Sequence, residues 1–218
     1  KHFAVNNQET NRNNNDSHLT QRPLRELYLK CFEIAVKESQ PWSVMTAYNK
    51  VNGKYTCEDR ELTEDILRDE WGFKGLVMSD WNAGKDAVTS IVAGNDMLQP
   101  GQDRQYKAIL EAVENGTLDL ALLDRSVKRV LEFVVKSHTF AGYEYPNKTD
   151  LEAHAQVDRE IGAEGIVLLD NKHVLRRDAG HKQVARCGTA TYDRGPAGMG
   201  VGSTGIGYYT VSMVEGLR

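Results

Sequence analysis

The sequence predicts an α/β fold with a parallel sheet, and three observations carry this prediction. Short apolar segments alternate with helical patterns through residues 1–135. The segment at residues 75–78 is apolar throughout, as in a strand buried on both faces. Polar residues follow each of four such segments. Four strand–helix units make about half of an eight-stranded (β/α)8 barrel, and a complete open sheet of four or five strands is the alternative.

The first two units occupy the start of the chain. A strand is expected at residues 1–5, followed by a helix that ends before Pro41. Apolar residues recur at spacings of three and four on one face of this helix, and they are Leu24, Leu27, Cys31, Ile34 and Ala35. The second strand covers residues 43–48 and is closed by an Asn-Gly turn at residues 52–53.

The third and fourth units follow directly. Thr63 can cap the next helix, which ends at Gly72. Residues 75–80 form the third strand, residues 82–93 a helix, and residues 95–98 the end of the fourth strand. Two more helices are expected, with apolar positions Ile109, Leu110 and Val113 in one and Val127, Val130, Leu131 and Val134 in the other.

The chain is expected to contain parts of two domains. Periodicity is lost at residues 138–149, which predict a linker. Residues 1–137 then make up the barrel half, and residues 150–218 begin a second α/β domain. The chain starts at Lys1 rather than Met and ends directly after an apolar stretch, so we expect an internal piece of a longer protein. A signal peptide cannot be judged, which leaves both a cytoplasmic and a secreted location open.

In the second domain, Asp150 is expected to cap a helix through Ile161. Residues 165–169 read as a buried strand, and a further strand at residues 184–187 leads into a glycine-rich loop. Residues 200–205 of that loop match the dinucleotide pattern GxGxxG. The fingerprint requires a strand directly before it and an acidic residue beyond it, and neither is present. A nucleotide-binding oxidoreductase is therefore a minor alternative that rests on this loop alone.

Composition excludes several classes of function. The net charge of −4 gives no basic surface for nucleic acid. No apolar run approaches the roughly 20 residues that would cross a membrane. The three cysteines are far apart, so they predict neither a disulfide framework nor a zinc site. The six histidines form no HExxH pattern, and we expect no metal and no cofactor.

Polar and aromatic residues stand at three of the four strand ends. Lys1 and His2 are at the first, Tyr48 is at the second, and Asp80 and Trp81 are at the third. In a parallel sheet these ends meet at one rim. A carboxylate, hydroxyl-binding donors and an aromatic wall suit a sugar better than a phosphate, which would call for arginines, glycine-rich amides or metal ligands. The alternative for Asp80 is a cap on the helix expected to start near Asn82.

The chain resembles glycoside hydrolase family 3, and above all its β-glucosidases. The resemblance rests on motifs that occur in order at residues 1–3, 6–12, 45–53, 71–81 and 162–169. It implies the C-terminal half of a TIM-like (β/α)8 barrel, followed by the beginning of an α/β sandwich domain. The second-domain stretch departs from the family pattern at Arg186 and in the loop at residues 200–204.

By that resemblance, Asp80 is the nucleophile of a retaining exo-β-glucosidase that removes terminal β-D-glucosyl residues. The residues implied to contact the sugar are Lys1, His2, Met45, Tyr48 and Trp81. The family's acid/base glutamate lies in the second domain beyond the end of this sequence, and early barrel strands would precede Lys1. The implied partners are a β-glucoside or a short β-linked oligosaccharide, the remainder of the same protein, and a second copy in a homo-oligomer.

Two alternatives stay open within this reading. The chain is then either an incomplete, non-catalytic sugar-binding fragment, or part of a β-xylosidase or β-N-acetylglucosaminidase of the same family. The last branch uses the histidine of an Asp-Ser-His loop as its acid/base, and residues 16–18 have those letters. However, Ala4 and Val5 replace the Pro-Gly of that branch, and His18 lies farther from Lys1 than its motif allows.

Overall fold

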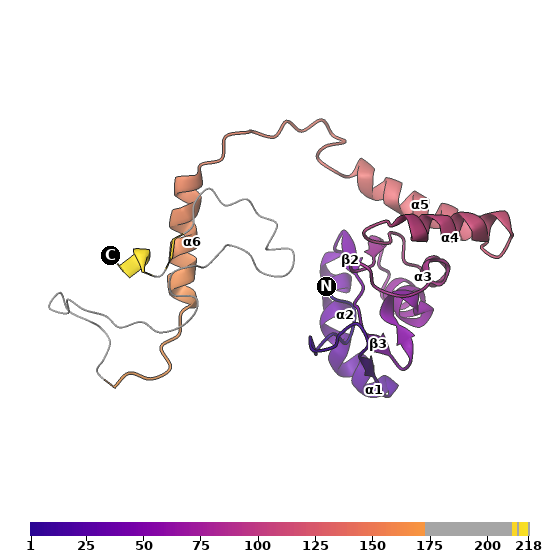
Figure 1. Cartoon of the computed structure of the whole chain (residues 1–218), viewed down its shortest axis with the longest axis horizontal. Coiled ribbons are helices and arrows are strands. Elements are labelled where there is room, and N and C mark those ends of the chain that lie inside the picture. Colours follow the sequence, from indigo (N-terminus) through magenta and orange to yellow (C-terminus); the bar gives the residue numbers. More distant parts are fainter. Residues whose placement is uncertain (173–210, 213, 218) are drawn as a thin grey trace. The chain divides into compact units, whose positions relative to one another are not determined.

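The computed structural model describes residues 1–172, 211–212 and 214–217. It divides into two compact units, Lys1–Pro146 and Asn147–Arg218 (Figure 1). The domain ranges drawn from the sequence remain a prediction. The expected strand at residues 184–187, Arg186 and the glycine-rich loop lie outside the described residues.

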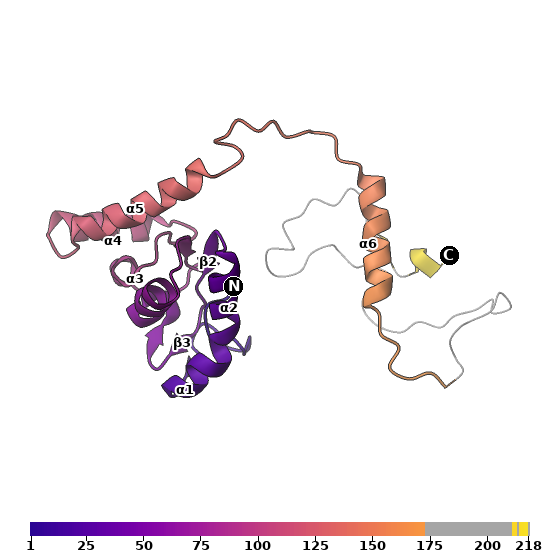
Figure 2. The same ribbon diagram turned by 180° about the vertical axis from the view of Figure 1, so that it is seen from behind.

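Four strand ends lie side by side in the first unit, each parallel to its neighbour. β2 (Ser43–Met45) pairs with β5 (Leu76–Met78) in parallel. Parallel bridges join Phe3 to Thr46 on one side and Met78 to Met97 on the other. The N-terminal segment therefore lies beside β2, as Figures 1 and 2 show. Spatial order follows chain order, as in consecutive strands of a (β/α) barrel, so the predicted α/β fold is confirmed.

Helices connect and flank these strands. In Figures 1 and 2, α3 lies against both α4 and α5. The helical elements of this unit are α1 (Gln21–Pro23), η1 (Leu24–Tyr28), α2 (Lys30–Ser39), η2 (Thr56–Glu58), η3 (Glu61–Glu70), α3 (Ala87–Ala93), α4 (Asp103–Glu114) and α5 (Leu120–Val135).

A small hairpin stands between the second strand and η3. β3 (Lys50–Val51) and β4 (Lys54–Tyr55) pair antiparallel, and β1 (Asp16–Ser17) pairs parallel with β3. Asn52 and Gly53 have φ values of 51° and 87°. Positive φ at both central residues is what a two-residue type I′ turn requires, so the predicted turn is confirmed.

Two helix starts differ from the prediction. η3 begins at Glu61, so Thr63 is not a cap but lies buried inside the helix, where its hydroxyl donates to the Ala93 carbonyl at 2.5 Å. α3 begins at Ala87, five residues later than expected, and its cap is Asp86, which accepts from the Thr89 N–H at 2.6 Å. Asn82, where the helix was expected to start, has a positive φ of 63°, which is incompatible with a right-handed helix.

The main core lies where η1, α2 and η3 pack on the sheet. Its buried members include Phe3, Leu24, Leu29, Val36, Val44, Leu62, Ile66, Leu67 and Val77. The predicted inward face of the first helix is wrong beyond Leu24, because Leu27 is 69% and Ile34 48% exposed, and Cys31 and Ala35 are also exposed. The Leu29 N–H bonds to the Leu24 carbonyl, five residues back. This wider turn changes which residues face inward.

The second unit contains one long helix among its described residues. α6 (Leu151–Gly165) is capped by Asp150, which accepts from the Ala153 N–H at 2.9 Å, as predicted. The strand expected at residues 165–169 is not formed. Gly165 still belongs to α6, and Leu169 is 93% exposed. No described segment pairs with these residues, and a strand needs a partner. η6 (Glu215–Leu217) closes the described part.

Among the residues that the structure describes, no helix is long and apolar enough to cross a membrane.

Candidate active site

Asp80 stands just beyond β5, at the rim of the parallel sheet. Its side chain is 13% exposed, so it is largely enclosed but open to a ligand. The Trp81 backbone N–H donates to Asp80 Oδ1 at 2.7 Å. Because Asp86 caps α3, Asp80 has no helix to cap, and that alternative is wrong.

His2 and Tyr48 reach Asp80 from the first and second strand ends. His2 Nε2 lies 3.4 Å from Asp80 Oδ2. The Tyr48 hydroxyl lies close enough to the Asp80 carboxylate to interact with it, and burial together with that carboxylate raises the pKa of Tyr48 above its ordinary value. Tyr48 therefore stays a protonated donor at neutral pH. Three segments that are far apart in sequence thus meet at one carboxylate.

The imidazole of His2 is held neutral in this setting. Burial lowers its pKa below 6.5, and the positive charge of Lys1 acts in the same direction. The charge of Asp80 opposes the shift without reversing it. Lys1, which is exposed, therefore lies close enough to act on His2 electrostatically.

The remaining predicted residues line the rim less closely. Trp81 follows Asp80 directly and is 60% exposed, so its indole is available as a flat apolar surface. Met45 lies one strand away from Asp80, paired in register with Met78 of β5, and is half-buried. His18 pairs with Asp16 at 3.4 Å and is mostly exposed.

Sequence reasoning missed two charged residues beside the site. The guanidinium carbon of Arg12 lies 4.5 Å from the centre of the Tyr48 ring. Glu9 holds Arg12 through an ion pair of 2.6 Å. Both belong to the segment at residues 6–12, which carried part of the family resemblance, but a loop has no periodicity that would indicate where its side chains point.

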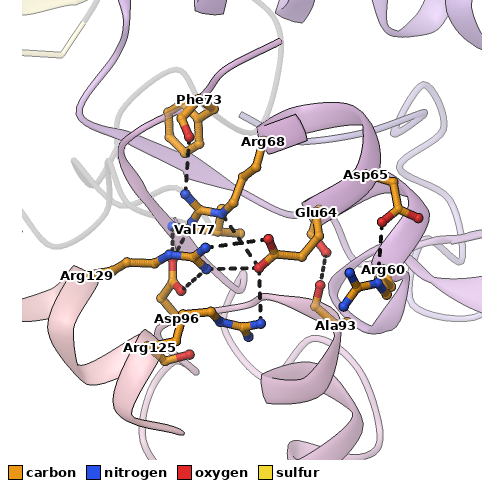
Figure 3. A network of polar contacts seen from close by, with 12 residues as sticks. Arg60, Glu64, Asp65, Arg68, Phe73, Val77, Ala93, Asp96, Arg125 and Arg129 are labelled. Carbon is orange, nitrogen blue, oxygen red and sulfur yellow. Dashed lines mark hydrogen bonds and ion pairs between the residues drawn. The ribbon is translucent and has the colours of Figure 1, made fainter. Parts of the chain in front are cut away.

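A second carboxylate, toward the other end of the strands, is used differently. Asp96 directly precedes Met97, the bridged residue of the fourth strand, and is ion-paired with Arg68 at 2.6 Å and Arg129 at 3.0 Å. Glu64 lies 2.9 Å from Arg129 and 3.4 Å from Arg125. Figure 3 shows the two carboxylates between the three guanidinium groups. These residues are called the arginine cluster below.

The arginine cluster joins α5 and η3 to the sheet. Asp96 Oδ2 also accepts from the Val77 N–H of β5 at 2.9 Å. Burial raises the pKa of Asp96, and its two arginine partners oppose that shift. The apolar stripe predicted for α5 is not its inward face, since Val127 and Leu131 are about half exposed. Arg125 and Arg129 face inward instead, because they form ion pairs there with Glu64 and Asp96.

Within the part of the chain that the structure describes, no group of three or more His, Cys, Asp or Glu side chains is arranged to hold a metal ion.

Consecutive parallel strands with a polar, carboxylate-bearing rim define a protein of the (β/α)-barrel class. The chain belongs to glycosyl hydrolase family 3, since residues 1–133 match the model of that family's N-terminal domain. This match favours the barrel over a complete open sheet.

Individual relatives agree with this assignment. β-Glucosidase B of Emericella nidulans is 40% identical over 227 aligned residues, covering 100% of this chain and 26% of that protein. The exo-α-(1→6)-L-arabinopyranosidase of Bifidobacterium longum is 41% identical over 176 residues, covering 80% of this chain and 23% of that protein.

A solved structure is similar to this chain over the chain's whole length. β-Glucosidase 3B of Thermotoga neapolitana in complex with glycerol has a TM-score of 0.86 at 44% identity, covering 100% of this chain and 31% of that one. The same enzyme in complex with α-D-glucose gives 0.82 at 42% identity, with the same coverage. The chain therefore spans about a quarter to a third of the length of these relatives.

Proposed function

We propose that this chain contributes the nucleophile and part of the sugar site to an exo-acting, retaining β-glucosidase. The observation that carries the proposal is Asp80, a largely enclosed carboxylate at a strand end with His2 and Tyr48 at its oxygens. The names of the relatives from Emericella and Thermotoga support the reaction class.

In the proposed reaction, Asp80 attacks the anomeric carbon of the terminal glucosyl residue. The bond to the leaving oxygen breaks as a second carboxyl group protonates that oxygen. Water then attacks the glucosyl–Asp80 ester, and the second carboxylate takes the proton from that water. Retention requires the two carboxyl groups about 5–5.5 Å apart. Because the chain spans only part of its relatives, we assign the second carboxyl to a segment outside residues 1–218.

The residues around Asp80 supply what this chemistry needs. Tyr48 is a protonated donor beside the carboxylate, while neutral His2 adds no second charge there. Lys1 and Arg12 are donors suited to sugar hydroxyl groups, and the exposed indole of Trp81 offers a face on which the sugar can stack. Met45, at the end of the neighbouring strand β2, completes the proposed sugar site.

The sugar is the finer part of the proposal. We propose a terminal β-D-glucosyl residue, with xylosyl and N-acetylglucosaminyl residues as the alternatives within the family. The Bifidobacterium relative acts on α-L-arabinopyranosyl linkages according to its name, so that sugar belongs in the same substrate panel.

The test replaces the nucleophile in the complete protein, with any segments that precede residue 1 or follow residue 218. Asp80→Asn should lower kcat on an aryl β-glucoside by roughly 10⁴-fold or more, because no covalent intermediate can form. Asp65→Asn is the matched control, since Asp65 is an exposed carboxylate paired with Arg60. Near-normal turnover by Asp80→Asn would overturn the assignment.

A second variant distinguishes a nucleophile from an acid/base residue. Asp80→Gly leaves space on the face of the sugar that the carboxylate attacked. Added azide should then displace the aryl group from that face and give α-glucosyl azide. A β-configured azide would assign Asp80 to the acid/base role instead. The non-catalytic alternative predicts glucose binding without turnover, even when Asp80 is intact in the complete protein.

A further inference from the structure

The loop that follows Asp80 is held in place by a residue that comes from a different element. This segment, residues 80–86, is called the Asp80 loop. Glu58, the last residue of η2, directs its carboxylate into the loop. Glu58 Oε1 accepts the backbone N–H of Lys85, and also that of Asp86 at 2.8 Å. Two neighbouring N–H groups that have no helix partner are thus satisfied by one carboxylate.

Gly84 shows independently how closely the loop lies on η2. Its φ is +76°, and a Cβ placed there would lie 2.6 Å from Cys57 Sγ and 2.7 Å from Glu58 Oε1. Any side chain at this position would push the loop away from η2. Close approach of the backbone is therefore a built feature of the contact between Glu58 and the loop.

The other side of the loop is tied to the fourth strand end. The Asn82 N–H donates to the Gln99 carbonyl at 2.9 Å, and the Gln102 side chain donates to the Asn82 side chain. At the start of the loop, the Trp81 N–H donates to Asp80 Oδ1 at 2.7 Å, and the Ala83 N–H donates to the Asp80 carbonyl at 3.1 Å. The orientation of the Asp80 carboxylate thus depends on where the loop backbone is held.

We propose that Glu58 is a positioning residue for the nucleophile, acting through the Asp80 loop and the Trp81 N–H. This inference rests on the proposed role of Asp80. The competing explanation is that Glu58 only stabilises a surface loop. The two differ in what they predict at temperatures well below unfolding, because only positioning changes the rate at which Asp80 attacks.

The experiment measures that attack directly in the complete protein. The probe is 2-deoxy-2-fluoro-β-glucosyl fluoride, which loses fluoride as Asp80 takes up the sugar, and the fluorine at C2 slows hydrolysis of the ester. Intact mass follows the gain of one fluoroglucosyl group with time. Glu58→Ala should slow the maximal labelling rate roughly tenfold, since small misplacements of a reacting group are costly. The same variant should lower kcat similarly and change KM less than about threefold.

Matched variants separate positioning from general stability. Glu58→Gln keeps an oxygen acceptor for both N–H groups and should label within about threefold of the wild type. Gly84→Ala should slow labelling as Glu58→Ala does, because its Cβ would push the loop away from η2 while Glu58 itself is kept. Glu61→Ala removes a half-buried carboxylate three residues away, whose side chain bonds the Gln21 side chain, and should label normally.

Each result supports or overturns the inference. Glu58→Ala labelled at the wild-type rate overturns it, as does a change confined to thermal stability. If Glu58→Ala does not fold, slow labelling of Gly84→Ala supports the inference and wild-type labelling of Gly84→Ala overturns it. Failure of the wild type to be labelled at Asp80 would instead contradict the proposed function, so the two failures are distinguishable.

Discussion

Asp80 and Asp96 belong to neighbouring strands, yet their positions and their surroundings are opposite. Met78 and Met97 form a parallel bridge, and Asp80 follows Met78 by two residues whereas Asp96 directly precedes Met97, so the two carboxylates lie toward opposite ends of the strands. The Asp80 side chain is 13% exposed and meets a neutral imidazole and a phenol. The Asp96 side chain is 0% exposed and meets two guanidinium groups and a backbone N–H. The place of a carboxylate along its strand and the partners that it meets there therefore decide together whether it can react.

The partners differ most in charge. In the arginine cluster, three guanidinium groups surround two carboxylates, so every negative charge is already paired inside the protein. Beside Asp80, burial and Lys1 keep His2 neutral. The charge of Asp80 thus remains available to an electrophilic carbon, whereas the charge of Asp96 is committed to holding α5 and β5 together.

The largest expected effect separates the two carboxylates by activity. Asp80→Asn should abolish nearly all turnover, by roughly 10⁴-fold or more, while its urea midpoint stays close to that of the wild type. Removing the charge of Asp80 leaves no unpaired cation behind, because its neighbour His2 is neutral. Steady-state kinetics and urea unfolding on the same samples check both halves. A large drop in stability for Asp80→Asn would mean that the two carboxylates are not different in kind.

The next effect is expected in stability rather than activity. Asp96→Asn keeps an acceptor for the Val77 N–H but leaves three arginines facing Glu64 alone. Breaking a buried ion pair in this way typically costs about 3–5 kcal/mol of unfolding free energy. Urea denaturation of the complete protein measures the loss. Glu70→Gln, which breaks the exposed pair between Glu70 and Arg25, is the control and should cost about 1 kcal/mol or less.

The sequence predicted the parts of this comparison that depend on local pattern. Apolar runs located β2 and β5 and placed Asp80 beyond a strand end, and the Asn-Gly pair located the hairpin turn. These features depend only on neighbouring residues and on the preferred φ of each type.

The sequence could not predict which side chains meet across the fold. Valines at helical spacing indicated an inward face for α5, yet Arg125 and Arg129 point inward, because Asp96 and Glu64 come from elements 29 or more residues away. Arg12 was missed because a loop gives no period. The five-residue turn in η1 changed the buried face of the first helix, and no propensity rule signals that turn.

The smallest expected effect tests how Asp80 and His2 act on each other. The folded pKa of His2 lies below 6.5, so the folded state binds fewer protons at this site than the unfolded chain. The stability that His2 contributes is therefore present above pH 6.5 and is lost as the pH falls through its folded pKa. Asp80 favours the charged imidazole, so Asp80→Asn should lower the pKa of His2 further and extend that loss to lower pH.

An NMR titration of the histidine ring signals measures the pKa of His2 in both proteins, and His2→Gln identifies its resonance. Unchanged titration in Asp80→Asn would show that the two side chains do not interact electrostatically. A titration of His2 above pH 6.5 in the wild type would show instead that the imidazole is charged. In that case Asp80 would be paired with a cation, as Asp96 is, and the two carboxylates would differ in burial and in their place along the strands.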